Sequence, residues 1–123
     1  MTGNEFYCTW LDHFAKGISK ENIEKYVVST GNYIWHVFSW ELLDKSRYLT
    51  GDEAKRAYDE ADKSGAVCIR WWFDEDETEP LGEKLKTAAA LDKFDEIYVA
   101  AGDFSWTYIK THEDTCGPYF MKL

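Results

Sequence analysis

The segment that most constrains the fold is a pair of apolar stretches on either side of Gly102 and Asp103. Residues 96–101 read EIYVAA and residues 104–111 read FSWTYIKT, and both are rich in the residue types that favour strands. A two-residue Gly-X loop matches the type II′ turn that joins neighbouring antiparallel strands. The C-terminal third of the chain therefore predicts a β-hairpin, and the rest of the chain must supply what packs around it.

Two further stretches have the composition of strands. Residues 33–40 (YIWHVFSW) are apolar on both faces, which predicts a central, covered strand. Residues 66–73 (AVCIRWWF) place Val67, Ile69, Trp71 and Phe73 on one face. Together with the hairpin, these stretches predict an antiparallel or mixed sheet of about four strands.

Four stretches have the apolar spacing of helices. The first contains Phe6, Trp10 and Phe14, and the second begins at the N-cap Ser19 and ends at Gly31. The third begins with a capping box at Thr50 and runs to Gly65, and the fourth covers residues 81–94. A chain of 123 residues fits one domain. We therefore expect residues 1–123 to form a single α+β domain with helices packed on the sheet.

The charge balance restricts the class of partner. The chain has 14 Lys and Arg against 23 Asp and Glu, a net charge of −9. This disfavours non-specific binding of nucleic acid or of an anionic membrane surface, because both need cations on the protein. It favours a basic protein partner, although an acidic surface is also explained by solubility alone.

The cysteines and the N-terminal residues indicate a cytoplasmic protein. The three cysteines form no CxxC pair, which disfavours a zinc ribbon, and free thiols suit a reducing compartment. No signal peptide is recognisable, and no apolar run approaches the ~20 residues that span a bilayer.

Aromatic residues make up 17% of the chain, more than a small core plainly needs. Trp and Tyr at a surface commonly anchor protein partners, whereas the simpler interpretation is a ring-rich core. The rings considered as anchors are those of Trp35, Trp72, Trp106 and Tyr119. The acidic run DEDETE at residues 74–79 is the matching candidate for steering a basic partner, through Asp74, Glu75, Asp76 and Glu77.

One polar cluster could carry chemistry. His112 lies beside Glu113 and four residues before Cys116, and a histidine with a carboxylate or a thiol can act as a base or activate a nucleophile. No oxyanion-hole motif accompanies it, and a strand end with a solvated histidine explains the same residues. His36 could join these residues around a metal, but ligand pairs at close spacing are absent. We therefore predict no metal and no cofactor.

Two segments together resemble a known family. They are YIWHVFSWE at residues 33–41 and DFSWTYIKTHE at residues 103–113, the latter followed by CGPYF at residues 116–120. The pair resembles the bacterial domain of unknown function 4275, from about Trp10 to Phe120. The resemblance implies no activity, cofactor or catalytic residue. Small acidic bacterial proteins of this kind sometimes resemble immunity proteins of toxin systems, which is an analogy.

These observations favour a small acidic protein-binding module, in its sharper form an immunity protein that neutralises a basic, nuclease-like toxin. A small enzyme using His112 with Glu113 or Cys116 and a small-molecule-binding module remain alternatives. The expected functional surface lies near residues 103–120, with Trp106, His112, Glu113 and Tyr119 as its main residues.

Overall fold

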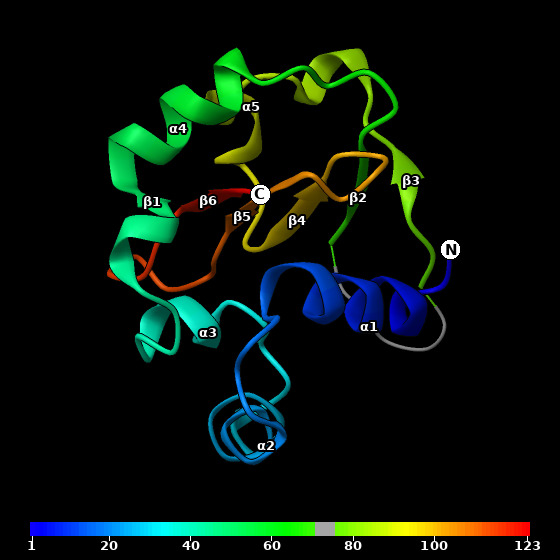
Figure 1. The fold of residues 1–123 in the computed structure, drawn as a ribbon. Coiled ribbons are helices and arrows are strands. Elements are labelled where there is room, and N and C mark those ends of the chain that lie inside the picture. Colours follow the sequence, from blue (N-terminus) through cyan, green and yellow to red (C-terminus); the bar gives the residue numbers. More distant parts are fainter. Residues whose placement is uncertain (71–75) are drawn as a thin grey trace.

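The computed structural model describes residues 1–70 and 76–123, and it confirms the α+β prediction. One antiparallel sheet lies between two layers of helices (Figure 1). Its strand order is β1-β6-β5-β4-β2-β3. The strands are β1 Leu49–Thr50, β2 Val67–Ile69, β3 Glu79–Pro80, β4 Ile97–Ala100, β5 Trp106–Lys110 and β6 Tyr119–Lys122. The expectation of about four strands is low by two: the two-residue edge strands β1 and β3 and the C-terminal strand β6 were not predicted, whereas the strand expected over residues 33–40 does not form.

The predicted hairpin is formed by β4 and β5, but its loop differs from the prediction. Strand β4 ends at Ala100 and β5 begins at Trp106, so residues 101–105 join the two strands instead of a two-residue turn. Phe104 adopts a positive φ of 57° and donates its amide to the carbonyl of Ala101 at 2.9 Å. The left-handed residue is therefore Phe104 and not Gly102. The side chain of Phe104 is buried, and its packing compensates for this backbone conformation.

The end of the chain is an inner strand of the sheet. Strand β6 pairs with β5 on one side and with β1 on the other. Tyr119 and Phe120 are therefore explained by their place in the sheet, although this region was predicted to be part of a binding surface.

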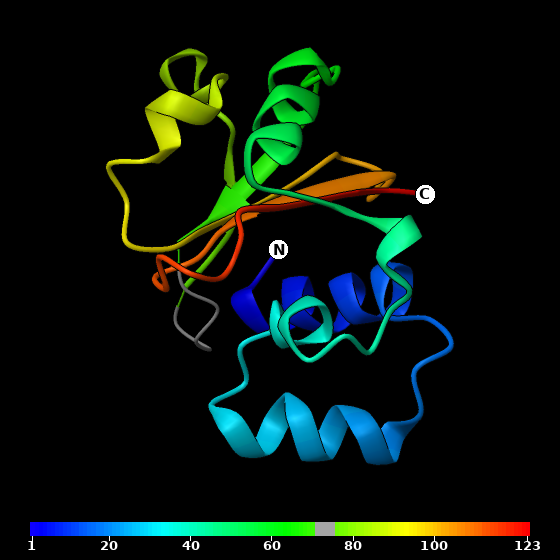
Figure 2. The same cartoon turned by 90° about the vertical axis from the view of Figure 1, so that its left-hand side faces the viewer.

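One face of the sheet is covered by α1 (Gly3–Phe14) and by the segment around α3 (His36–Ser39), with α2 (Lys20–Tyr26) outside them (Figure 2). A capping box joins Thr2 and Glu5 at the start of α1. The buried residues of α1 are spaced at helical intervals and pack against Tyr98 and Ala100 of β4. The first helix and the N-cap Ser19 of the second are confirmed, but α2 ends at Tyr26 and a 3-10 turn at Val28–Thr30 leads to Gly31.

The predicted strand over residues 33–40 is wrong. These residues form a turn followed by the short helix α3. Ile34, Val37 and Phe38 are buried, and their i, i+3, i+4 spacing is that of one helix face. The high content of aromatic and β-branched residues reflects burial of this segment under the sheet and not strand formation.

The opposite face of the sheet is covered by α4 (Gly51–Glu60) and α5 (Ala88–Leu91). Tyr58 of α4 stacks on Tyr108 of β5 with ring centroids 4.5 Å apart. Its hydroxyl donates to the carbonyl of Leu85 at 2.7 Å, whereas the buried hydroxyl of Tyr108 has no hydrogen-bond partner among the described residues.

Two helix predictions on this face need correction. Thr50 is the N-cap of α4, but its side chain accepts no hydrogen bond there, so the expected capping box does not form. The helix expected over residues 81–94 is instead a 3-10 turn at Glu83–Leu85 followed by the four-residue α5.

Across the described part of the chain, no helix is both long enough and apolar enough to span a membrane.

Candidate functional site

A buried carboxylate stands at the start of β4. Glu96 is 4% exposed, and the first residue of β4 follows it directly. Its Oε1 accepts from the indole Nε1 of Trp35 at 3.1 Å, and its Oε2 accepts from the hydroxyl of Tyr98. A buried carboxylate is tolerated when donors replace its lost hydration, and these two buried side chains do so.

His112 completes the shell of donors around Glu96. It follows β5 by two residues, and β5 is the strand paired with β4. The ring Nδ1 lies 2.7 Å and the backbone N lies 3.3 Å from Oε1 of Glu96. The side chain of His112 is 36% exposed, and its Nε2 lies 3.5 Å from a carboxylate oxygen of Glu113. With Nδ1 held at Glu96, the other ring nitrogen of His112, Nε2, is directed away from Glu96.

The α3 segment brings a second histidine to the same place. The ring of His36 lies 4.3 Å from that of Trp35 and 5.9 Å from that of Tyr33, and its Nδ1 lies 3.0 Å from Oγ of Ser39. Tyr33 in turn lies 5.0 Å from the ring of His112. Burial lowers the pKa of His36, and the charge of Glu96 opposes part of that shift. The two segments that carry the family resemblance thus meet around Glu96.

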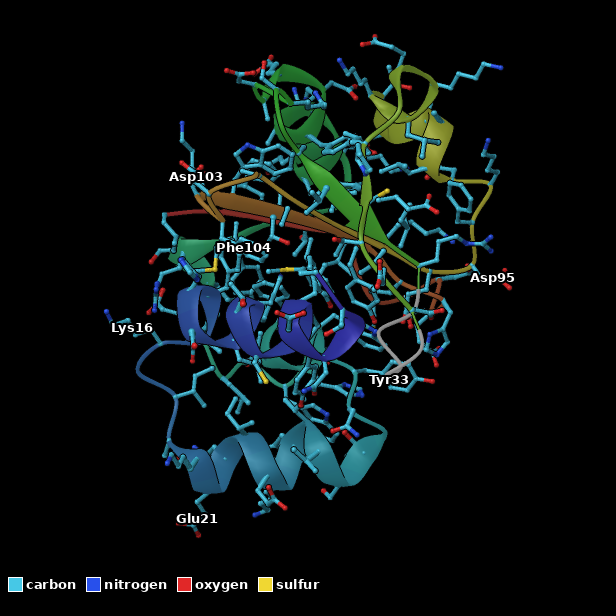
Figure 3. The ribbon with its side chains drawn as sticks, turned by 90° about the vertical axis from the view of Figure 1, so that its right-hand side faces the viewer. Lys16, Glu21, Tyr33, Asp95, Asp103 and Phe104 are labelled. Carbon is cyan, nitrogen blue, oxygen red and sulfur yellow. The ribbon has the colours of Figure 1, made fainter. Side chains whose placement is uncertain are left out.

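Of these residues, Tyr33, Glu96 and His112 line a cleft of 780 Å³ at one end of the sheet. Figure 3 shows Tyr33 and Asp95 at this end and Asp103 at the opposite end. Among the described residues, five carboxylates line the cleft together with the guanidinium of Arg70, which lies over the ring of Phe94 at 4.8 Å. The carboxylates are those of Asp76, Glu77, Glu79, Asp95 and Glu96. The cleft is strongly negative and accepts cationic groups more readily than anionic ones.

The acidic run contributes to this cleft in part. The backbone of residues 76–78 pairs with the start of the chain: Gly3 donates to the carbonyl of Asp76 at 2.7 Å, and Thr78 donates to the carbonyl of Met1 at 2.9 Å. The predicted residues Asp76 and Glu77 line the cleft. The predicted residues Trp72, Asp74 and Glu75 lie outside the described residues.

Three of the rings considered as anchors are not at the surface. Trp35, Trp106 and Tyr119 are 2%, 5% and 6% exposed. Trp106 stacks on Phe120, and Tyr119 stacks on Phe38. The expectation that these rings are exposed is wrong, because inner strands and the covered α3 segment place them in the core.

Cys116 is not part of the histidine cluster. Its thiol lies near Tyr119, whose pKa is raised by burial and by the neighbouring Cys116. No hydrogen bond joins His112 to Cys116 in the described part of the chain. The side chain that binds Nδ1 of His112 is that of Glu96, which was predicted only as a strand residue. One feature of the sequence marks Glu96: it is the charged residue at the head of the otherwise apolar stretch 96–101.

Metal binding has no geometric support among residues 1–70 and 76–123. No group of three or more His, Cys, Asp or Glu side chains in these ranges is arranged to hold a metal ion. Nε2 of His112 lies 3.5 Å from a carboxylate oxygen of Glu113, but neither His36 nor Cys116 completes a ligand set with them.

Comparison with known proteins gives one match. A family model described as "Domain of unknown function (DUF4275)" matches residues 1–120, which confirms the resemblance carried by the two segments. No curated protein and no solved structure gives a match.

Proposed function

The chain belongs to the DUF4275 family. We propose that it binds a basic protein partner through the acidic cleft. The observation that carries this proposal is the charge of the cleft, where five carboxylates and one guanidinium line 780 Å³. Lys and Arg side chains entering the cleft are attracted to it, and the net charge of −9 speeds their approach.

The geometry of His112 adds a second contact of the right kind. When the ring is neutral and its Nδ1–H is donated to Glu96, the Nε2 is an acceptor at the rim of the cleft. Glu113 lies 3.5 Å from this atom and adds a further carboxylate there. Both groups accept hydrogen bonds from an ammonium or guanidinium group.

A charge-reversal experiment tests the proposal. The probe is a fluorescein-labelled peptide of four Lys-Ser repeats, titrated by fluorescence anisotropy at low and at physiological ionic strength. Glu77→Lys places a cation in the cleft. Glu60→Lys is the matched control, because Glu60 is exposed and lines a separate cavity that Asp103 also lines. Both variants change the net charge equally.

We expect Glu77→Lys to weaken peptide binding by about tenfold and Glu60→Lys by less than about twofold, because close charges couple far more strongly than distant ones. Equal weakening by the two variants would show that the peptide responds to net charge alone and would remove the cleft from the proposal. Absence of peptide binding to the wild-type protein at both ionic strengths would reject it.

The sharper form of the proposal is an immunity protein whose partner is a basic toxin, such as a nuclease. It draws on the acidic charge and on analogy with small acidic immunity proteins. The test is to mix the protein with a basic nuclease encoded beside its gene and to measure nuclease activity. Inhibition at an equimolar ratio that Glu77→Lys relieves supports this form, and full activity at saturating protein rejects it.

A second candidate is a small enzyme in which His112 acts as a general base. The contact that favours it is the 2.7 Å hydrogen bond between Nδ1 of His112 and Glu96, since a buried carboxylate orients catalytic histidines in the same way. Turnover of a panel of chromogenic esters and phosphoesters by the wild type and by His112→Gln tests it. Turnover that His112→Gln leaves unchanged, or no turnover at all, argues against this role.

A further inference from the structure

A row of aromatic rings leads away from the acidic cleft over the α3 side of the molecule. Tyr33 lines the cleft, and its ring centroid lies 5.9 Å from that of His36. The ring of His36 lies 6.5 Å from that of Trp40, which lies 5.5 Å from that of Tyr26. We call these four residues, Tyr33, His36, Trp40 and Tyr26, the aromatic strip.

Trp40 is the most exposed ring of the strip. Its side chain belongs to the C-cap residue of α3 and is 53% exposed, whereas the other three strip residues are partly buried. Among the described residues, Trp40 is the one Trp, Tyr or Phe whose side chain is exposed. A tryptophan held by ring contacts on a surface has already lost side-chain freedom, so little further entropy is lost when a partner covers it.

We propose that the aromatic strip is a docking site for arginine side chains of an extended segment of the basic partner whose other cations enter the acidic cleft. This inference rests on the proposed function and adds the kind of residue that the partner presents. Continuity with the cleft and charge complementarity support it, because Tyr33 belongs to both surfaces.

The spacing of the rings matches an extended chain. Alternate side chains of a β-strand project from the same face about 6.8 Å apart, given a rise of about 3.4 Å per residue. The neighbouring ring centroids from Tyr33 to Trp40 lie 5.9 Å and 6.5 Å apart. Successive alternate residues of one segment can therefore each meet a ring of the strip or a carboxylate of the cleft.

Guanidinium groups suit both surfaces better than ammonium groups do. A planar guanidinium stacks on aromatic faces and pairs with a carboxylate through two parallel hydrogen bonds. Arg70 already lies over the ring of Phe94 within the cleft wall. Among the described residues, Lys25 lies against the strip, 5.2 Å from the ring centre of Tyr26, at the end far from the cleft. Lys45, five residues after Trp40, is paired with Glu41 at 2.8 Å. Burial lowers the pKa of His36, which disfavours its cationic form.

The test compares two peptides on one set of variants. Peptides of four Arg-Ser and four Lys-Ser repeats are titrated against the wild type, Trp40→Ala, Trp40→Phe and Glu77→Lys. Leu123→Ala is the matched control, because Leu123 has a similar exposure of 56% and does not belong to the strip. Thermal unfolding of every variant is measured alongside, so that a loss of fold is recognised directly.

The wild type is expected to bind the arginine peptide about five times more tightly than the lysine peptide, and Trp40→Ala is expected to remove most of that preference. Trp40→Phe should retain part of it, and Leu123→Ala all of it. Glu77→Lys should weaken both peptides together. If Glu77→Lys weakens both while Trp40→Ala leaves the arginine preference intact, the inference is overturned and the proposed function stands.

If the wild type binds neither peptide, the proposed function fails and the inference fails with it. One further result overturns the inference alone. If the wild type sediments as a dimer that Trp40→Ala converts into a monomer, the strip is occupied by a second copy of this chain and not by a basic partner.

Discussion

Replacing Glu96 by alanine should cost a large part of the stability of the fold. The carboxylate of Glu96 accepts hydrogen bonds from the buried side chains of Trp35 and Tyr98, and both hydrogen bonds are lost in Glu96→Ala. Removing the acceptor of a buried hydrogen bond costs about 1–3 kcal/mol. Since His112 is partly exposed, water can replace its lost contact, so the two buried hydrogen bonds give an expected loss of about 2–6 kcal/mol.

The assay is urea unfolding followed by circular dichroism, because Trp35 fluorescence itself will change. Asp95→Ala is the control. Asp95 is the exposed carboxylate directly before Glu96 and lines the same cleft, so the charge change is matched and the expected effect is within about 0.5 kcal/mol. A domain of this kind is typically stable by about 5–15 kcal/mol, so Glu96→Ala should remain foldable but unfold at clearly lower urea.

A double-mutant cycle separates the lost hydrogen bond from lost packing. Trp35→Phe removes the indole donor, and its cost should be smaller by about 1–2 kcal/mol when Glu96 is already alanine. A loss below about 1 kcal/mol in Glu96→Ala, or costs of Trp35→Phe that are equal in the two backgrounds, would refute the view that this carboxylate holds the α3 segment to the sheet.

Three further predictions concern other parts of the structure. Tyr108→Phe removes a buried hydroxyl that has no hydrogen-bond partner among the described residues, so it should change the free energy of unfolding by less than about 0.5 kcal/mol or increase it. Tyr58→Phe removes a hydroxyl that is hydrogen-bonded, so it should lower the free energy of unfolding by about 1 kcal/mol, and chemical denaturation measures both values. Gly102→Ala places a Cβ 2.7 Å from the carbonyl oxygen of Gly65 and should lower the melting temperature, at a cost of about 1–3 kcal/mol; an unchanged melting temperature would show that this loop shifts freely. Burial lowers the pKa of His36 in the folded state, so the stability that the neutral ring contributes is fully present above about pH 6.5 and is lost as the pH falls through the folded-state pKa. Urea unfolding at pH 7.5 and at a lower pH should therefore show a smaller decrease in the free energy of unfolding for His36→Gln than for the wild type, and equal decreases would contradict this prediction.

The sequence predicted the elements whose local signals agree with their final environment. The hairpin of β4 and β5 has strand-forming residues on both sides of a turn, and α1 has three aromatic residues at helical spacing. Those two elements also cover each other in the structure, so local preference and packing favour the same conformation. Residues 76 and 77 were predicted as part of an acidic loop, and the structure adds that they line a cleft.

Composition misled where burial was mistaken for strand formation. Residues 33–40 carry the residue types of a buried strand, yet their buried positions follow a helical interval. The candidate site depended on that segment, because α3 delivers Trp35 and His36 to Glu96. No local pattern shows that residue 35 and residue 112 meet at one carboxylate, because that contact depends on long-range packing across the sheet.

The inner position of β6 has a consequence for the order of events during synthesis. Strand β1 is made roughly 70 residues before Tyr119–Lys122, its strand partner among the described residues. At about 5–20 residues per second, that delay lasts ~3–14 s, and throughout it β1 lacks the strand with which it pairs. Strand β5 is made shortly before β6 and waits far less. The sheet can therefore be completed only when β6 has been made, and slower translation should lengthen the time for which Leu49 and Thr50 stay unpaired.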